Sequence, residues 1–277
     1  MLLLKKLKSP INNKSLLKTF KRYFSQNDLS FDKYPFLIQI GLAKENLGCY
    51  NGKEWCGSNQ TTISVNPADN TNTAIIKLSS EENYEQCISN MQKVQEKWSS
   101  LSMVSRGLIV QEIGQELKKN KETLGSIISL EMGKIYSEGL GEVQEAIDIC
   151  DYAMGLSRTI SGKILASERQ DHIQYENWNP IGLMGCISAF NFPHAVLGWN
   201  AAISMICGNL TMWKGAPTTT LVSIATTKII TNVLEKHGYG GVFTMISETG
   251  KTLSEKMSGD KRLPLISFTG SSEVYYK

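Results

Sequence analysis

The sequence lacks the features that would place it quickly in several classes of protein. None of its six cysteines forms a CxxC pair or a spacing suited to zinc, so reduced thiols in an intracellular compartment are expected. No apolar run reaches the roughly 20 residues that span a membrane. The hydrophobic fraction of 41% and the charged fraction of 20% are ordinary for a soluble globular protein. A chain of 277 residues holds one large domain or two small ones.

Acidic residues are absent from residues 1–27, which carry seven Lys or Arg. Leucines and Phe20 are interleaved with these positive charges, a composition typical of an amphipathic mitochondrial presequence, and Arg22–Ser25 resembles a matrix-protease cleavage site. The composition favours mitochondrial targeting; the alternative is a disordered basic tail on a cytoplasmic protein. The remainder has 22 basic and 26 acidic residues, so the net charge of +3 gives no reason to expect nucleic-acid binding.

Four apolar runs in the second half of the chain show no alternation, which is typical of strands covered on both faces of a parallel sheet. They are Ile181–Phe190, Leu210–Lys214, Val242–Ile246 and Leu263–Phe268. Helices are predicted between them, opened by Pro193, by Pro217 and near Gly250, with the first ending at Gly208. The pattern over residues 179–277 predicts an α/β fold with a Rossmann-like parallel sheet and flanking helices.

Residues 28–162 are predicted to be mainly helical. The expected elements are a short helix within Phe31–Leu47, a strand over Thr61–Asn66, a helix capped by Ser79 and Glu82, helices at about 103–119 and 121–131, and a helix around Val143–Met154. Residues 163–178 differ, because Ile173 and Tyr175 alternate with polar neighbours. This alternation predicts a half-exposed hairpin, serving either as a plain surface hairpin or as a contact between subunits.

The sequence also lacks the usual signs of a dinucleotide site. The turn after the first predicted parallel strand contains no GxGxxG, and the second strand ends at Lys214 rather than at an acid that would hold a ribose. From the residues alone, nucleotide binding is therefore only one interpretation of this sheet.

Three motifs nevertheless resemble one family. The sequence resembles NAD-dependent aldehyde dehydrogenases, and the motifs are most similar to those of the antiquitin-like branch. The motifs are Ala189–Pro193 (AFNFP), Trp213–Thr219 (WKGAPTT) and Ser267–Ser271 (SFTGS). The resemblance runs from near Tyr34 to the last residue and covers the first half of such an enzyme. It implies that NAD binds and that a hairpin like 163–178 joins subunits.

The resemblance also implies a set of cofactor contacts. It assigns hydrogen bonds to the adenosine ribose to Lys214, the adenine side to Gly250, and the pyrophosphate to a helix that begins at Gly270. The implied cofactor-binding residues are Ser188, Ala189, Phe190, Lys214, Ala216, Pro217, Gly250, Gly270 and Ser271. Many members of the family carry a glutamate at the position of Pro217, where it contacts the ribose. The antiquitin-like branch shares the proline and uses NAD, so the resemblance implies NAD rather than NADP as the cofactor.

Asn191 is the one residue of catalytic type. In the family, the matching amide helps to hold the oxyanion formed when a cysteine thiolate adds to the aldehyde. The structural alternative is a capping asparagine at the start of the next helix.

The cysteine nucleophile and the glutamate base of the family's mechanism have no match in this sequence. The chain is accordingly expected to be a truncated, inactive and marginally stable relative of enzymes that oxidise a semialdehyde to a carboxylate. It would take an aldehyde only when completed by a catalytic domain. The alternatives are a non-catalytic subunit that forms a homo- or hetero-oligomer through residues 163–178, or an incomplete sequence of an active enzyme. Neither nucleic acid nor membrane is expected as a partner.

Overall fold

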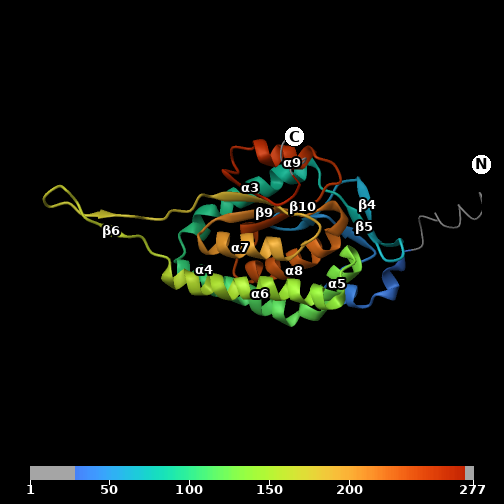
Figure 1. The fold of residues 1–277 in the computed structure, drawn as a ribbon. Helices are drawn as coiled ribbons and strands as arrows, with labels where there is room; N and C mark the ends of the chain where they lie inside the picture. The colour runs from blue at the N-terminus through green and yellow to red at the C-terminus, as the bar shows by residue number, and fades with distance from the viewer. Residues whose placement is uncertain (1–28, 272–277) are drawn as a thin grey trace, which may run out of the picture.

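The computed structural model describes residues 29–271 (Figure 1). The presequence predicted over residues 1–27 and the last six residues, 272–277, lie outside this range. Among the described residues, no helix is both long enough and apolar enough to cross a membrane.

The described part of the chain begins with a short helix inside the predicted range Phe31–Leu47 and a small sheet beside it. The elements here are η1 (Ser30–Lys33), α2 (Phe36–Gln39), β1 (Glu45–Leu47), β4 (Thr61–Asn66) and β5 (Thr71–Lys77). Strand β5 pairs in parallel with β1 and antiparallel with β4, and β4 has the predicted bounds. The predicted short helix is present as α2, but β1 at the end of the predicted range was missed, because it is held by a strand some 30 residues away, which a local pattern does not reveal.

Four long helices follow, close to the predicted ranges. They are α3 (Glu81–Ser99), α4 (Met103–Lys119), α5 (Lys121–Met132) and α6 (Tyr136–Thr159). The capping box of α3 uses Ser80 and Asn83 rather than Ser79 and Glu82. Ser79 is instead buried, donating to the carbonyl of Gly48 and accepting from the backbone N–H of Ser247, so it joins two distant segments.

The central sheet has six strands in the order β11-β8-β9-β10-β2-β3. The parallel strands are β8 (Leu183–Ile187), β9 (Leu210–Lys214), β10 (Phe243–Ile246) and β11 (Leu265–Phe268), and the antiparallel extension is β2 (Cys49–Tyr50) and β3 (Trp55–Cys56). The predicted Rossmann-like sheet is confirmed. The helical description of residues 28–162 was incomplete, because that part supplies two strands of this sheet and shares one continuous core with the rest.

The crossover helices explain how the sheet is layered. They are α7 (Ala195–Ile206), α8 (Thr220–Lys236, preceded by the 3-10 turn η2, Pro217–Thr219) and α9 (Thr252–Gly259). Helix α7 ends before Gly208, whose φ of +86° fits the predicted stop. Figure 1 shows α3 and α9 on one side of the sheet and α7 and α8 on the other, with α4, α5 and α6 forming a further layer below them.

The predicted hairpin is present and stands away from the body (Figure 1). Its strands β6 (Ile164–Leu165) and β7 (Gln174–Tyr175) pair antiparallel, with Ile164 opposite Tyr175. Both of its faces are open rather than one: Ile173 (80% exposed) and Tyr175 (71% exposed) lie on one face, and the intervening Gln174 on the other face is exposed as well.

Candidate functional site

The four parallel strands end in register at one edge of the sheet. Ile187, at the end of β8, pairs with Lys214 of β9 on one side and with Phe268 of β11 on the other, and Ile246 of β10 pairs with Lys214. The four turns that carry the sequence-predicted site residues therefore leave the same edge. Between β8 and β11 the strand order reverses, and ligands of open α/β sheets bind outside the carboxyl ends of the strands at such a switch point.

The turn after β8 is tied to β9 and then turns outward. The backbone N–H of Ser188 donates to the carbonyl of Lys214 at 3.1 Å, and the buried Ser188 hydroxyl accepts from the indole N–H of Trp213 at 2.9 Å. Ala189 is half-buried, whereas Phe190 is 56% exposed and Asn191 is also exposed. Ser188 thus fixes the start of the turn, and Phe190 and Asn191 form its exposed surface.

Asn191 is not the cap of the following helix. Its side chain makes no hydrogen bond to any residue between 29 and 271, and α7 begins after His194 without a side-chain cap of its own. The cap comes from Glu142 of α6, whose Oε1 accepts from the backbone N–H groups of His194 at 2.7 Å and Ala195 at 3.1 Å. The structural alternative for Asn191 is therefore wrong, and its amide is free to point to a ligand.

A lysine holds Glu142 and the exposed turn together. The ammonium of Lys134 lies 2.8 Å from Oε2 of Glu142 and 3.8 Å from the centre of the Phe192 ring. This combination of an ion pair and a cation–π contact anchors the segment directly after Asn191.

Lys214 is buried at the end of β9. Burial lowers the pKa of its ammonium, and the nearby carboxylate of Glu248 opposes that shift. The Nζ–Oε1 distance is 3.7 Å, too long for a hydrogen bond, and no described residue makes a closer polar contact with this ammonium. After the buried Gly215, the chain reaches the surface, with Ala216 half-buried and Pro217 and Thr218 exposed, and Thr219 is buried again.

The glycine turns lie beside these residues. Gly250, in the turn between β10 and α9, is exposed, and a Cβ built on it would meet no atom within 4 Å, so this part of the edge is open. Gly270 follows β11, and a Cβ there would come within 2.6 Å of the Phe268 ring. Ser271 is exposed and is the last described residue, so the helix expected to start here lies outside the described range.

Sequence reasoning missed three glutamates that cap the crossover helices. Glu142 caps α7, Glu131 of α5 accepts from the backbone N–H groups of Leu221 and Val222 in α8, and Glu248 accepts from those of Leu253 and Ser254 in α9. The first turns of these three helices are thus already occupied by carboxylates. An anionic ligand group at this edge is left with the turn at Gly270 and Ser271.

The described residues include all six cysteines, and none is suited to attack a carbonyl. Burial raises the pKa of the Cys150 and Cys186 thiols to about 12 and also raises that of Cys207. The pKa values of Cys49 and Cys56 are raised as well, and Cys87 is fully buried. A nucleophilic cysteine needs the opposite, a thiolate stabilised near neutral pH.

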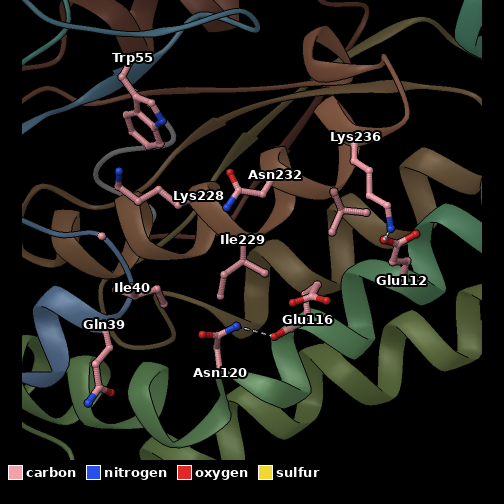
Figure 2. Close-up of a pocket in the computed structure, with 12 residues that line it drawn as sticks. Gln39, Ile40, Trp55, Glu112, Glu116, Asn120, Lys228, Ile229, Asn232 and Lys236 are labelled. Carbon is pink, nitrogen blue, oxygen red and sulfur yellow. Dashed lines mark hydrogen bonds and ion pairs between the residues drawn. The ribbon is translucent and has the colours of Figure 1, made fainter.

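A cavity of about 540 Å³ lies away from the sheet edge, among α2, α4, α8 and Trp55. In Figure 2 the ammonium of Lys228 lies below Trp55, 4.9 Å from the ring centre, and Glu112 pairs with Lys236 at the far end. None of the sequence-predicted site residues lines this cavity. The sheet edge remains the candidate site because the predicted motifs converge there.

Comparison with solved structures supports the fold. Betaine aldehyde dehydrogenase from Staphylococcus aureus in complex with NAD⁺ superposes with a TM-score of 0.81 at 24% identity, over 90% of this chain and 49% of that chain. An NADP-dependent enzyme from E. coli superposes with a TM-score of 0.78 at 20% identity, over 83% and 48%. At these identities the likeness concerns the fold alone.

Comparison of sequences identifies the family. An aldehyde dehydrogenase family 7 member A1 homolog from Dictyostelium discoideum is 51% identical over 88% of this chain and 48% of its own length. The α-aminoadipic semialdehyde dehydrogenase of Bos taurus is 47% identical over 87% and 45%. The chain thus spans about half the length of the curated relatives it matches. The model of the aldehyde dehydrogenase family matches residues 55–277, and the chain belongs to this family.

Proposed function

We propose that this chain forms the NAD-binding half of an antiquitin-type aldehyde dehydrogenase. The observation that carries the proposal is the register of Ile187, Lys214, Ile246 and Phe268, which brings all the segments expected to contact the cofactor to one edge. Bound NAD would supply a hydride acceptor. Among this chain's own residues, Lys214 would donate to the adenosine ribose, and the turn at Gly270 and Ser271 would face the pyrophosphate.

In the complete reaction, the substrate would be a semialdehyde, as in the bovine relative's name. That name is consistent with lysine degradation, which we propose as the pathway. Asn191 would then donate its side-chain amide to the oxyanion. Donors placed in advance at such a position contribute about 3–4 kcal/mol to lowering a barrier. Because none of the six thiols is suited to be a nucleophile, we expect no aldehyde oxidation by the 277-residue chain on its own.

Titration calorimetry of the 277-residue chain with NAD tests this proposal. We expect saturable binding, weakened at least about tenfold by Lys214→Met because the ribose loses its donor. Lys228→Met is the control, since Lys228 is also partly buried but lines the α8 cavity. Absence of NAD binding by the unaltered chain contradicts the proposal, and so does an equal loss in both variants. NADH formation with a semialdehyde by the chain alone contradicts its inactivity.

A second candidate function is that of a non-catalytic subunit that joins full-length relatives. The exposed apolar side chains of the projecting hairpin favour it, with Ile164 at 84%, Ile173 at 80% and Tyr175 at 71% exposure. Co-purification with a full-length aldehyde dehydrogenase should be lost in the Ile173→Asp/Tyr175→Asp double variant. It should survive Ile38→Asp, which alters an isoleucine 61% exposed on α2. Failure of the unaltered chain to co-purify contradicts this function.

The location we propose for the chain is the mitochondrial matrix, from the acid-free, basic and leucine-containing composition of residues 1–27. A fluorescent protein fused after residue 277 should enter mitochondria, and deletion of residues 2–27 should leave it in the cytoplasm. Cytoplasmic signal from the undeleted fusion contradicts the proposal and supports the basic-tail alternative.

A further inference from the structure

No acidic residue stands at the end of β9, but the carboxylate of Glu248, in the turn after the neighbouring strand β10, lies beside that end. Dinucleotide-binding sheets commonly place an acid at the end of the second strand, where it accepts hydrogen bonds from the ribose hydroxyls. Here the second strand ends in Lys214, followed by the uncharged residues Gly215, Ala216 and Pro217. Strand β10 lies beside β9 with Ile246 in register with Lys214, and Glu248 follows two residues later.

Glu248 and Lys214 form a buried pair at this edge. Their side chains are each 8% exposed, and Oε1 of Glu248 lies 3.7 Å from Nζ of Lys214. The separation leaves the ammonium without a direct hydrogen bond to the carboxylate. A ligand hydroxyl that bridges the two groups can therefore accept a hydrogen bond from the Lys214 ammonium and donate one to the Glu248 carboxylate.

Helix α9 holds the carboxylate in position. Oε2 accepts from the backbone N–H of Leu253 at 2.9 Å, and Oε1 accepts from the backbone N–H of Ser254 at 2.8 Å and from the Ser254 hydroxyl. These three donors fix the orientation of the Glu248 carboxylate at the start of α9. Oε2 accepts from one donor among the described residues, the backbone N–H of Leu253, and keeps a lone pair for a ligand.

We infer that Glu248 makes this site select NAD over NADP. Its carboxylate accepts a hydrogen bond from the adenosine ribose, and its charge repels the 2′-phosphate that distinguishes NADP. The buried ammonium of Lys214 by itself would attract that phosphate, so the direction of the selection depends on Glu248. The fold does not settle the choice, because both cofactors occur among structures of this fold. The inference rests on the NAD binding proposed above.

The test measures the dissociation constants of NAD and NADP for the same preparation of the 277-residue chain by calorimetry. The unaltered chain should bind NAD at least about tenfold more tightly than NADP. Glu248→Gln should remove most of this preference by strengthening NADP binding. The matched control is Glu131→Gln, which makes the same change in a buried carboxylate that caps α8, and it should leave the ratio unchanged.

A second variant keeps the test decisive if Glu248→Gln does not fold. Lys214→Gln leaves the carboxylate without its ammonium, so the preference for NAD should increase even as both cofactors bind more weakly. A falling preference in Lys214→Gln, or an unchanged ratio in folded Glu248→Gln, overturns the inference while NAD binding stands. No NAD binding by the unaltered chain overturns the proposed function and this inference together.

Discussion

The carboxylate of Glu142 accepts a hydrogen bond from the backbone N–H of His194 at 2.7 Å, joining the middle of α6 to the start of α7 across 52 residues. It also accepts from Ala195 and pairs with Lys134 at 2.8 Å. One buried side chain thus satisfies two free N–H groups of a helix and fixes the turn that carries Asn191.

Glu142→Ala should lower the free energy of unfolding by about 3 kcal/mol, because it leaves the Lys134 ammonium and two N–H groups without their acceptor. Urea unfolding followed by circular dichroism measures the change. Glu145→Ala, on the exposed face of the same helix, serves as the control and should change stability by less than about 0.5 kcal/mol. Equal changes in the two variants would contradict a role for Glu142 as the cap of α7.

Glu131 should make stability fall as pH rises toward neutral. Burial raises the pKa of its carboxyl from 4.5 to about 7, despite hydrogen bonds from Leu221, Val222 and Ser64 that lower it. The native state then keeps a proton that the unfolded chain releases. The contribution of this group is full below about pH 4.5 and is lost by about pH 7, a change of about 3 kcal/mol.

The Glu131 prediction is checked by the difference in unfolding free energy between the unaltered chain and Glu131→Gln from pH 4.5 to 7.5. The advantage of the unaltered chain should shrink across this range. A difference that is flat with pH, or one that grows, contradicts the raised pKa.

His194 should have the opposite effect on the pH dependence of stability, lowering stability as the pH falls. Burial lowers the pKa of its imidazole from 6.5 to about 4, although the carboxylate of Glu142 raises it. Protonation is then easier in the unfolded chain, so the contribution of His194 is full above about pH 6.5 and falls by about 3 kcal/mol as the pH drops to about 4.

His194→Asn, which retains a polar group near the Thr226 hydroxyl, should remove this acid-side loss in thermal melts between pH 4 and 7. His172→Asn in the exposed hairpin is the matched control and should melt like the unaltered chain at every pH. Parallel pH profiles for His194→Asn and the unaltered chain would contradict a buried neutral imidazole.

Two glycines of α6 offer a test of how closely α5 and α6 pack. A Cβ on Gly139 would lie 2.5 Å from the carbonyl oxygen of Gly125, whereas a Cβ on Gly141 would meet no atom within 4 Å. Gly139→Ala should cost about 1–3 kcal/mol of stability through the backbone shift it forces. Gly141→Ala should gain up to about 1 kcal/mol from helix propensity, and equal effects in urea unfolding would rule out the close approach.

Elements whose signals are local could be predicted from the sequence alone. Apolar runs predicted β8 to β11 because strands buried on both faces leave no place for polar residues, and Gly208 marked the end of α7 because its φ of +86° suits glycine. The motifs around Asn191, Lys214 and Gly270 also identified the turns that meet at the sheet edge.

Which carboxylate caps which helix depends on tertiary packing and could not be predicted from the sequence. Glu131 and Glu142 look like ordinary helical glutamates, and their partners begin 90 and 52 residues further along the chain. Glu248 had no motif to single it out, and its role depends on β10 lying beside β9. The packing of distant helices and the pairing of distant strands bring these carboxylates to their N–H partners, and neither is encoded in the spacing of residues along the chain.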